Sequence, residues 1–216
     1  MSKIKLVVFD MDGTLINDRT IFVFAEKKGF LDDLKKLIYN NEIEFYKKSK
    51  EIAKSLKGMK SNELIKIFRE IRLHENVEKV VKELKKRNIK TAIITDSYQF
   101  VADDLKKRLG IDYAFANNLI IHDDIVTGEL EINNKELIED EVNKNNIYSV
   151  CKSCILEKLC KINNIKINET MAIGDGKVDI CMLKKAGIGI AFNAPEEVKK
   201  HADICTNNML EILKYI

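Results

Sequence analysis

Two aspartates, Asp10 and Asp12, follow a short apolar run near the start of the chain, and a glycine and a threonine come directly after them. Such an apolar run is typical of a buried parallel strand. Carboxylates one residue apart at the end of a strand repel each other unless a cation or a proton lies between them. Mg²⁺ prefers oxygen ligands, and a free carboxylate is also a nucleophile. The spacing therefore predicts a Mg²⁺ site with a carboxylate that attacks phosphorus; the alternative is a strand that ends in a solvated acidic turn.

Strand and helix patterns alternate along the rest of the chain, and they determine where these carboxylates lie. The predicted strands span 3–10, 91–95, 170–173, 188–192 and 202–205, with extended segments at 114–116 and 119–122 and a hairpin at 122–131 that turns near Asp123 and Asp124. The predicted helices span 75–87, 100–109, 154–163, 178–185 and 209–216. This alternation predicts an α/β fold with a parallel sheet that is covered by helices on both faces.

Polar residues stand where several of these strands end, namely Asp10, Asp12, Thr95 and Asp175. In open parallel sheets, ligands bind beyond the carboxyl ends of the strands. We therefore expect these side chains to meet at one edge of the sheet.

Residues 20–71 differ from the rest because apolar residues recur there at helical spacing with little strand signal. Gly29 and Gly58 are candidate helix ends, and Ser61 is a candidate helix start. The pattern predicts a small all-helical insert after the first strand. We place the α/β domain at 1–16 and 75–216, and the insert at 17–74.

The bulk composition excludes several classes of protein. The chain of 216 residues is 45% hydrophobic and 33% charged, which is typical of a soluble globular protein. Lys and Arg number 37 against 34 Asp and Glu, so no strong net field favours nucleic acid, and no nucleic-acid partner is expected. No run approaches the roughly 20 apolar residues of a membrane span, and no secretory signal is visible. We expect a cytoplasmic protein without a membrane partner; the oligomeric state is left open.

Five cysteines, an odd number, speak against a fully paired disulfide framework and favour a reducing compartment. Cys151 and Cys154 nevertheless form a Cys-x-x-Cys pair, a spacing that redox sites and metal sites use. Our favoured interpretation is that both are small residues packed around a helix start. The alternative is a disulfide that holds the loop with Lys152 and inhibits the protein on oxidation.

Four ordered motifs resemble those of the haloacid dehalogenase superfamily: FDMDGTL at 9–15, Thr95 at a strand end, Lys152, and GDGKVD at 174–179. The resemblance extends over essentially the whole chain. The helical insert and the hairpin resemble the cap and the flap of the phosphoserine phosphatase-like branch. This resemblance implies a Rossmann-like parallel sheet flanked by helices, with an all-helical cap and a β-hairpin flap.

The resemblance also implies catalytic and metal-binding roles. Asp10 would be the nucleophile that forms an aspartyl-phosphate, and Asp12 would be the general acid and then the general base. Mg²⁺ would be held by Asp10, by Asp175 and by Asp12 through its backbone carbonyl.

Further roles concern the phosphate itself. The implied phosphate-binding residues are Thr95, Asp96, Lys152 and the backbone amide of Gly13, with Asp179 behind them to orient Lys152 or hold a water. A Lys, a Thr or an Asp also occurs at such positions for purely structural reasons, so each role is a hypothesis for its own residue.

The leaving-group pocket departs from the phosphoserine phosphatase pattern. Arg19 stands where an acid normally takes the ammonium of the substrate, and Lys50 aligns best with the arginine that takes its carboxylate. Arg19 would repel an ammonium and favour a carboxylate or a second phosphate, whereas Asp96 would supply an acid from another direction. We take Arg19, Phe45 and Lys50 as candidate specificity residues, with Phe45 and neighbouring apolar residues shielding the site from water.

The predicted function is Mg²⁺-dependent hydrolysis of a small-molecule phosphate monoester by a phosphoserine phosphatase-like enzyme, a phosphoric monoester hydrolase. The alternatives are a phosphatase for another small acid or a sugar phosphate, and a phosphotransferase or mutase of the same superfamily. A receiver-like phospho-switch is disfavoured by the long helical insert and the GDG motif. A catalytically inactive binding protein is disfavoured because Asp10, Asp12, Lys152 and Asp175 are all present.

Overall fold

Strand β1 (Leu6–Phe9) lies near the centre of the sheet, and its side chains alternate between the two faces. Val7 and Phe9 join one buried apolar cluster, and Leu6 and Val8 join the other. Both faces are therefore covered, which explains why the strand is apolar at every position. The computed structural model describes residues 4–144 and 146–216; the predicted strand began at Lys3, which lies outside the described residues.

The sheet has the order β4-β3-β2-β1-β5-β6-β7. Its other strands are β2 (Lys90–Tyr98), β3 (Tyr113–His122), β4 (Ile125–Glu131), β5 (Thr170–Gly174), β6 (Ile188–Phe192) and β7 (Ile204–Thr206). All neighbouring pairs are parallel except β3 and β4, which form the predicted antiparallel hairpin. Asp123 and Asp124 form its turn with positive φ values of 48° and 69°. The predicted sheet is thus confirmed, and the extended segments near 114 and 119 are one strand.

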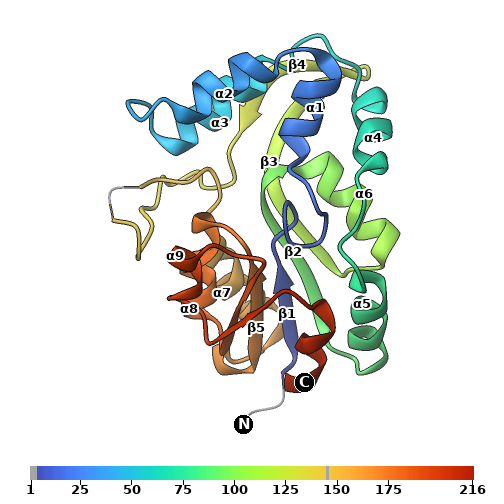
Figure 1. Cartoon of the computed structure of the whole chain (residues 1–216), viewed down its shortest axis with the longest axis vertical. Helices are drawn as coiled ribbons and strands as arrows, with labels where there is room; N and C mark the ends of the chain where they lie inside the picture. Colours follow the sequence, from blue (N-terminus) through green and yellow to red (C-terminus); the bar gives the residue numbers. More distant parts are fainter. Residues whose placement is uncertain (1–3, 145) are drawn as a thin grey trace.

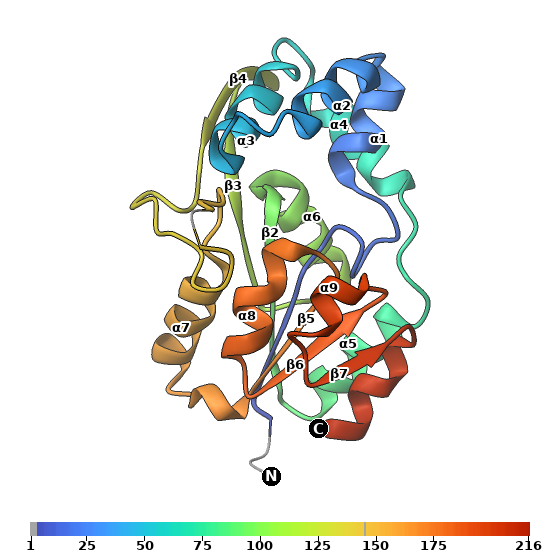
Figure 2. The ribbon, with the colours of Figure 1, turned by 60° about the vertical axis from the view of Figure 1, so that its left-hand side comes forward.

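Helices cover the sheet in two layers. Helices α5 (Val77–Lys86) and α6 (Gln99–Leu109) and the 3₁₀ helix η3 (Met209–Tyr215) pack on the face of Val7. Helices α7 (Lys152–Asn163), α8 (Ile180–Lys185) and α9 (Glu196–Lys199) pack on the face of Leu6. Figure 2 shows α7 and α8 together on the near side of the sheet.

Some helical predictions differ in detail from the structure. Residues 209–216 were expected to form an α-helix, but η3 has the tighter 3₁₀ geometry. The segment expected to be helical from Val178 begins with a 3₁₀ turn, η2 (Lys177–Asp179), and another such turn, η1 (Ile167–Glu169), precedes β5. Helix α9 was not predicted, although Pro195 directly before it is a helix-start signal.

The insert contains four α-helices: α1 (Thr20–Lys28), α2 (Leu31–Tyr39), α3 (Phe45–Lys54) and α4 (Ser61–Glu70). They lie together at one end of the molecule, beside the tip of the β3–β4 hairpin (Figure 1). Backbone hydrogen bonds join the two parts, from the Gly58 amide to the Val126 carbonyl (2.8 Å) and from the Val126 amide to the Met59 carbonyl (2.9 Å). The hairpin is therefore joined to the insert through the backbone. The division into two domains at 17–74 stays a prediction.

None of the helices in the part of the chain that the structure describes has both the length and the apolar composition needed to cross a membrane. The cytoplasmic location expected from the sequence stays a prediction.

Candidate active site

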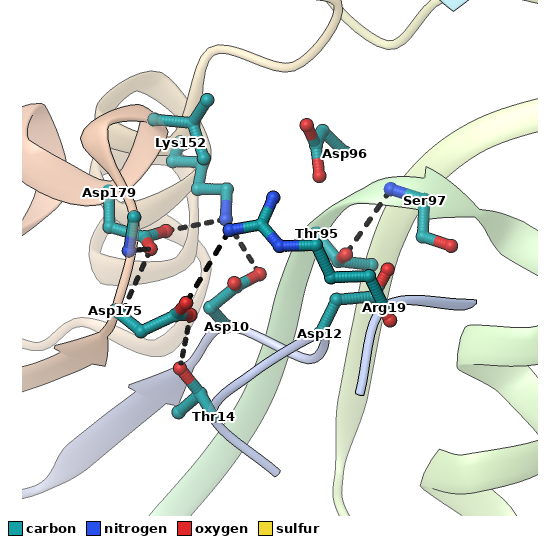
Figure 3. A network of polar contacts seen from close by, with 12 residues as sticks. Asp10, Asp12, Thr14, Arg19, Thr95, Asp96, Ser97, Lys152, Asp175 and Asp179 are labelled. Atoms are coloured by element: carbon teal, nitrogen blue, oxygen red, sulfur yellow. Dashed lines mark hydrogen bonds and ion pairs between the residues drawn. The ribbon is translucent and has the colours of Figure 1, made fainter. Parts of the chain in front are cut away.

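Six polar residues from separate segments meet at the carboxyl edge of the sheet (Figure 3). Asp10 and Asp12 follow β1, Thr95 lies within β2, and Asp175 follows β5; Lys152 begins α7 and Asp179 ends η2. The neighbouring strands β2, β1 and β5 are parallel, so their carboxyl ends point the same way. In the structure, the side chains that were expected to meet at one edge of the sheet do lie there.

Lys152 is fully buried between two carboxylates. Its Nζ lies 2.7 Å from Oδ1 of Asp10 and 2.5 Å from Oδ1 of Asp179. Burial alone would lower the pKa of Lys152, but Asp10 and Asp179 raise it above its ordinary value. The lysine is therefore a permanent buried cation in contact with the Asp10 carboxylate.

Asp179 is held in place from several directions. Its Oδ2 accepts hydrogen bonds from the amides of Asp175 (3.1 Å) and Gly176 (2.9 Å), while its Oδ1 faces Lys152. A Cβ at Gly174 would come within 2.5 Å of Asp179 Cγ, so only glycine fits there. These contacts position Lys152 through Asp179.

Asp10, Asp175 and Asp179 each offer a carboxylate oxygen within 4.8 Å of the others, and Asp10 and Asp179 are buried. Burial, the negative charge of Asp179 and to a lesser degree Asp175 raise the pKa of Asp10 well above its usual range, although Lys152 acts in the opposite direction. Oxygen donors this close together suit a hard divalent cation, which would relieve that repulsion. The residues thus fit a metal site. The oxygens of Asp179 are already hydrogen-bonded, so Asp10 and Asp175 are the freer ligands.

Gly13 makes room for Asp175. It has a φ of +86°, and a Cβ on it would come within 2.5 Å of Asp175 Oδ2. Its amide donates to the Ile16 carbonyl (2.9 Å), and the Thr14 amide donates to the Met11 carbonyl (3.3 Å). The turn after β1 uses the Gly13 amide, so the predicted contact between this amide and the phosphate stays a prediction. The Thr14 hydroxyl instead donates to Asp175 Oδ1 (3.0 Å).

The side chain of Asp12 lies apart from the three clustered carboxylates. Its Oδ1 accepts a 2.6 Å hydrogen bond from the hydroxyl of Thr20, the first residue of α1. Burial raises the pKa of Asp12 to about 7, although the bond from Thr20 opposes this shift. A carboxyl group with a pKa near neutrality is suited to both giving and taking a proton.

Thr95 is fully buried, and its Oγ1 accepts a hydrogen bond from the Ser97 amide (3.2 Å). Its hydroxyl proton is therefore available for another acceptor. Asp96 is exposed, and the side-chain amide of Asn117 donates to its backbone carbonyl (2.7 Å) and to Ser149 Oγ (2.9 Å). Asn117 thus fixes the end of β2 against the loop that precedes α7.

A cavity of about 240 Å³ connects this edge of the sheet with the insert. Its walls at the sheet edge come from Asp10, Asp12, Arg19, Asp96, Ser97, Tyr98, Asp175, Gly176 and Val178. Its walls at the insert end come from Ile21, Phe22, Ile38, Phe45, Lys48, Ser49 and Ile52, and Leu130, Tyr148 and Ser149 complete the lining.

Two of the three candidate specificity residues, Arg19 and Phe45, line the cavity, and the third, Lys50, does not. Arg19 lines the cavity with its guanidinium 3.7 Å from Asp175 Oδ2, and Phe45 lines it with its ring centroid 5.0 Å from that of Tyr148. Lys50 is exposed, its Nζ lies 5.9 Å from the Tyr46 ring centroid, and it does not line the cavity.

Lys48, on the same helix, lines the cavity instead and was missed by the sequence analysis. One signal pointed to it: it is three residues after Phe45 and four before Ile52, so all three share a face of α3. Ser97, Tyr148 and Ser149 were also missed as wall residues, since no local pattern brings them to the site.

Cys151 and Cys154 form a disulfide, and Lys152 lies between them in the sequence. The favoured expectation, that they are two unpaired packing residues, is therefore wrong. Both contacts of Lys152 are present in the disulfide-bonded chain. This state does not displace Lys152, which argues against the proposed inhibition on oxidation.

Comparisons with known proteins agree with this geometry. Residues 7–184 match the model of the haloacid dehalogenase-like hydrolase family. A phosphoserine phosphatase of Methanocaldococcus jannaschii is 37% identical over 219 residues, which cover 99% of this chain and 98% of that protein. A solved structure described as a phospho-aspartyl intermediate analogue of phosphoserine phosphatase has a TM-score of 0.82 at 35% identity, and each chain is covered completely. A substrate-bound phosphoserine phosphatase complex has a TM-score of 0.82 at 34% identity, again with complete coverage of both chains.

These relatives confirm the predicted Rossmann-like fold and the predicted enzyme class, a phosphatase that resembles phosphoserine phosphatases. The motifs at 9–15 and 174–179 both fall within the matched residues. The chain belongs to the haloacid dehalogenase-like hydrolase family.

Proposed function

We propose that this enzyme hydrolyses a small-molecule phosphate monoester with Mg²⁺, and that Asp10 carries the phosphoryl group between two steps. The observation that supports this most is the buried ammonium of Lys152, 2.7 Å from Asp10 and 2.5 Å from Asp179. Lys152 opposes the burial and the neighbouring acids that raise the pKa of Asp10, and so favours the ionised form that a nucleophile needs. The structural relative described as a phospho-aspartyl intermediate analogue supports the same chemistry.

In the first step, a carboxylate oxygen of Asp10 forms a bond to phosphorus as the bond from phosphorus to the ester oxygen breaks. Asp12 donates its proton to the departing oxygen, so the product leaves as an alcohol. The Thr20 hydroxyl holds the Asp12 carboxyl group in place during this transfer. Lys152 offsets the charge that builds up on the phosphoryl oxygens, and the Thr95 hydroxyl donates to one of them.

In the second step, Asp12 takes a proton from water, and the water oxygen forms a bond to phosphorus. The bond between Asp10 and phosphorus breaks, inorganic phosphate leaves, and the Asp10 carboxylate is regenerated. The enzyme thus uses one residue as an acid and then as a base.

Mg²⁺ would be held by Asp10 and Asp175 and, as the family resemblance implies, by the backbone carbonyl of Asp12; when bound, it supplies positive charge to the phosphoryl oxygens. Thr14 and Gly13 keep the Asp175 carboxylate in position for that role. The insert would act as a cap that keeps bulk water from the acyl-phosphate bond, with Phe22 and Phe45 in the cavity wall.

The test is a phosphate-release assay with Mg²⁺ on phosphorylated amino acids, hydroxy acids, sugars and nucleotides. Asp10→Asn keeps the shape of the side chain but removes the nucleophile, so we expect loss of turnover by about 10⁴-fold or more. Wild-type enzyme quenched with a ³²P-labelled substrate should carry acid-stable label on Asp10, and Asp10→Asn should carry none. Undiminished turnover by Asp10→Asn would refute the proposal. Consumption of ester without an equal release of phosphate would favour the phosphotransferase instead.

A further inference from the structure

Lys48 is a buried cation without a buried anion to match it. Lys48 is only 8% exposed, yet it makes no ion pair with any carboxylate among the described residues. Its Nζ donates to the Ile38 carbonyl (2.8 Å) and lies 5.1 Å from the Phe45 ring centroid. An ammonium has three donors, and a buried lysine is rare unless it is paired. One carbonyl and one ring do not satisfy this group.

The ammonium of Lys48 lies at the wall of the substrate cavity. Ile38 and Phe45, which interact with its Nζ, both line that cavity, as Lys48 itself does. The other wall residues contributed by α1–α3 are apolar or neutral: Ile21, Phe22, Ser49 and Ile52. Lys48 is therefore the charged group that the described part of these helices presents to the cavity.

The acids of the cavity all lie at the other end. Asp10 and Asp12 follow β1, Asp175 follows β5, and Asp96 lies in β2 close to its carboxyl end. A substrate whose phosphoryl group contacts Asp10 would extend between apolar walls toward Lys48. An anion of the substrate would complete Lys48, because none of the carboxylates in the described residues forms an ion pair with it.

We propose that Lys48 binds a second anionic group of the substrate, a carboxylate, so that the substrate is the phosphate ester of a small hydroxy acid. This inference rests on the proposed function, which supplies the phosphoryl end. A volume of about 240 Å³ holds only a small ester. An ammonium on the carbon next to that carboxylate, as in phosphoserine, would lie beside Lys48 and near the apolar walls, where like charges repel at low dielectric. The preferred ester therefore lacks that ammonium.

Three esters of matched length test the inference: 3-phosphonooxypropanoate, phosphoserine, and propyl phosphate. The first has a carboxylate only, the second adds the ammonium, and the third has neither group. We expect kcat/KM for the propanoate to exceed that for propyl phosphate by at least about tenfold, the effect of one charge-assisted hydrogen bond. It should exceed that for phosphoserine by a similar factor, because Lys48 repels the ammonium of phosphoserine. A preference for phosphoserine or for propyl phosphate would overturn the inference.

Lys48→Met removes the charge and keeps much of the length and apolar volume of the side chain. It should lower kcat/KM for the propanoate about 10- to 100-fold more than for propyl phosphate, mainly through KM. Lys48→Arg should retain most of the preference. Lys47→Met is the matched control, because Lys47 is the exposed neighbour on the same helix, and the preference should survive it. Equal losses on both esters, with a lowered melting temperature, would make Lys48 a structural residue and refute the proposal.

Binding separates this inference from the proposed function. In an Asp10→Asn background, calorimetry should find tighter binding of the propanoate than of propyl phosphate, and Lys48→Met should remove that difference. If no ester is hydrolysed by the wild-type enzyme but the binding difference depends on Lys48, the proposed function fails and the anion site stands. If the wild-type enzyme hydrolyses esters but Lys48→Met does not change the binding difference, the inference about Lys48 is wrong and the proposed function stands.

Discussion

Two buried lysines differ in how completely the protein satisfies them: Lys152, which contacts Asp10 at the sheet edge, and Lys48, which lines the cavity in the insert. Lys152 at the sheet edge contacts Asp10 and Asp179. Lys48 at the insert end has only a backbone carbonyl and an aromatic ring. A buried charge costs free energy unless it is paired, so the first lysine belongs to a complete network and the second to an incomplete one. We propose that the complete end carries out the chemistry and that a substrate contributes the missing charge at the incomplete end.

The complete end should be the more sensitive to loss of its lysine. Lys152→Met leaves Asp10 and Asp179 buried without their cation, so the free energy of unfolding should fall by about 3–5 kcal/mol. Turnover should fall by about 10³-fold or more, because the charge on the transferred phosphoryl group is no longer offset. Denaturant unfolding and steady-state kinetics measure the two effects. Activity above a tenth of wild type would contradict the role given to Lys152.

Gly13→Ala tests the turn that positions Asp175. A Cβ at this position, where φ is +86°, would lie 2.5 Å from Asp175 Oδ2. We expect the carboxylate to be displaced, with a cost of about 1–3 kcal/mol in stability and a weaker response to Mg²⁺. A Mg²⁺ titration of activity measures the second effect. Gly29→Ala is the control, because its φ is +81° but nothing lies within 4 Å of the added Cβ. An unchanged Mg²⁺ response in Gly13→Ala would contradict this reasoning.

Reduction of the Cys151–Cys154 disulfide, also at the sheet edge, should change activity and stability less than the two substitutions above. Lys152 keeps both carboxylate contacts in the disulfide-bonded chain, so the oxidised enzyme should be at least as active as the reduced one. Opening so short a loop should cost about 1–2 kcal/mol of stability. Activity and unfolding in dithiothreitol and in oxidising buffer are the measurements, with Cys151→Ser as the permanently open form. An oxidised enzyme that loses activity would restore the inhibition hypothesis.

Lys50→Met should have the smallest effect. Lys50 is exposed and does not line the cavity, although the sequence made it the candidate for contact with a substrate carboxylate. We expect kcat/KM for every ester to stay within about twofold of wild type, since an exposed charge is screened by solvent. A selective rise in KM for carboxylated esters would show that α3 presents a different face to the substrate.

The chemistry at the sheet edge could be read from the sequence because it depends on local patterns. An apolar run that ends in Asp10 and Asp12, and another that precedes Asp175, identify strand ends, and parallel strands bring those ends together by geometry alone. The helix predicted at 154–163 placed Lys152 just before a helix start, and in the structure α7 begins at Lys152 itself.

Only the tertiary structure decided the remaining features, because each depends on distances between segments far apart in the chain. Lys48 and Lys50 are both lysines of α3, and their roles differ only because one faces the cavity and the other faces solvent. The amide of Gly13 is used by its own turn, which residue type does not reveal. Tyr148 reaches the Phe45 ring from a loop that carries no periodic pattern. Sequence periodicity specifies which face of an element is buried, whereas packing decides which neighbour that face meets.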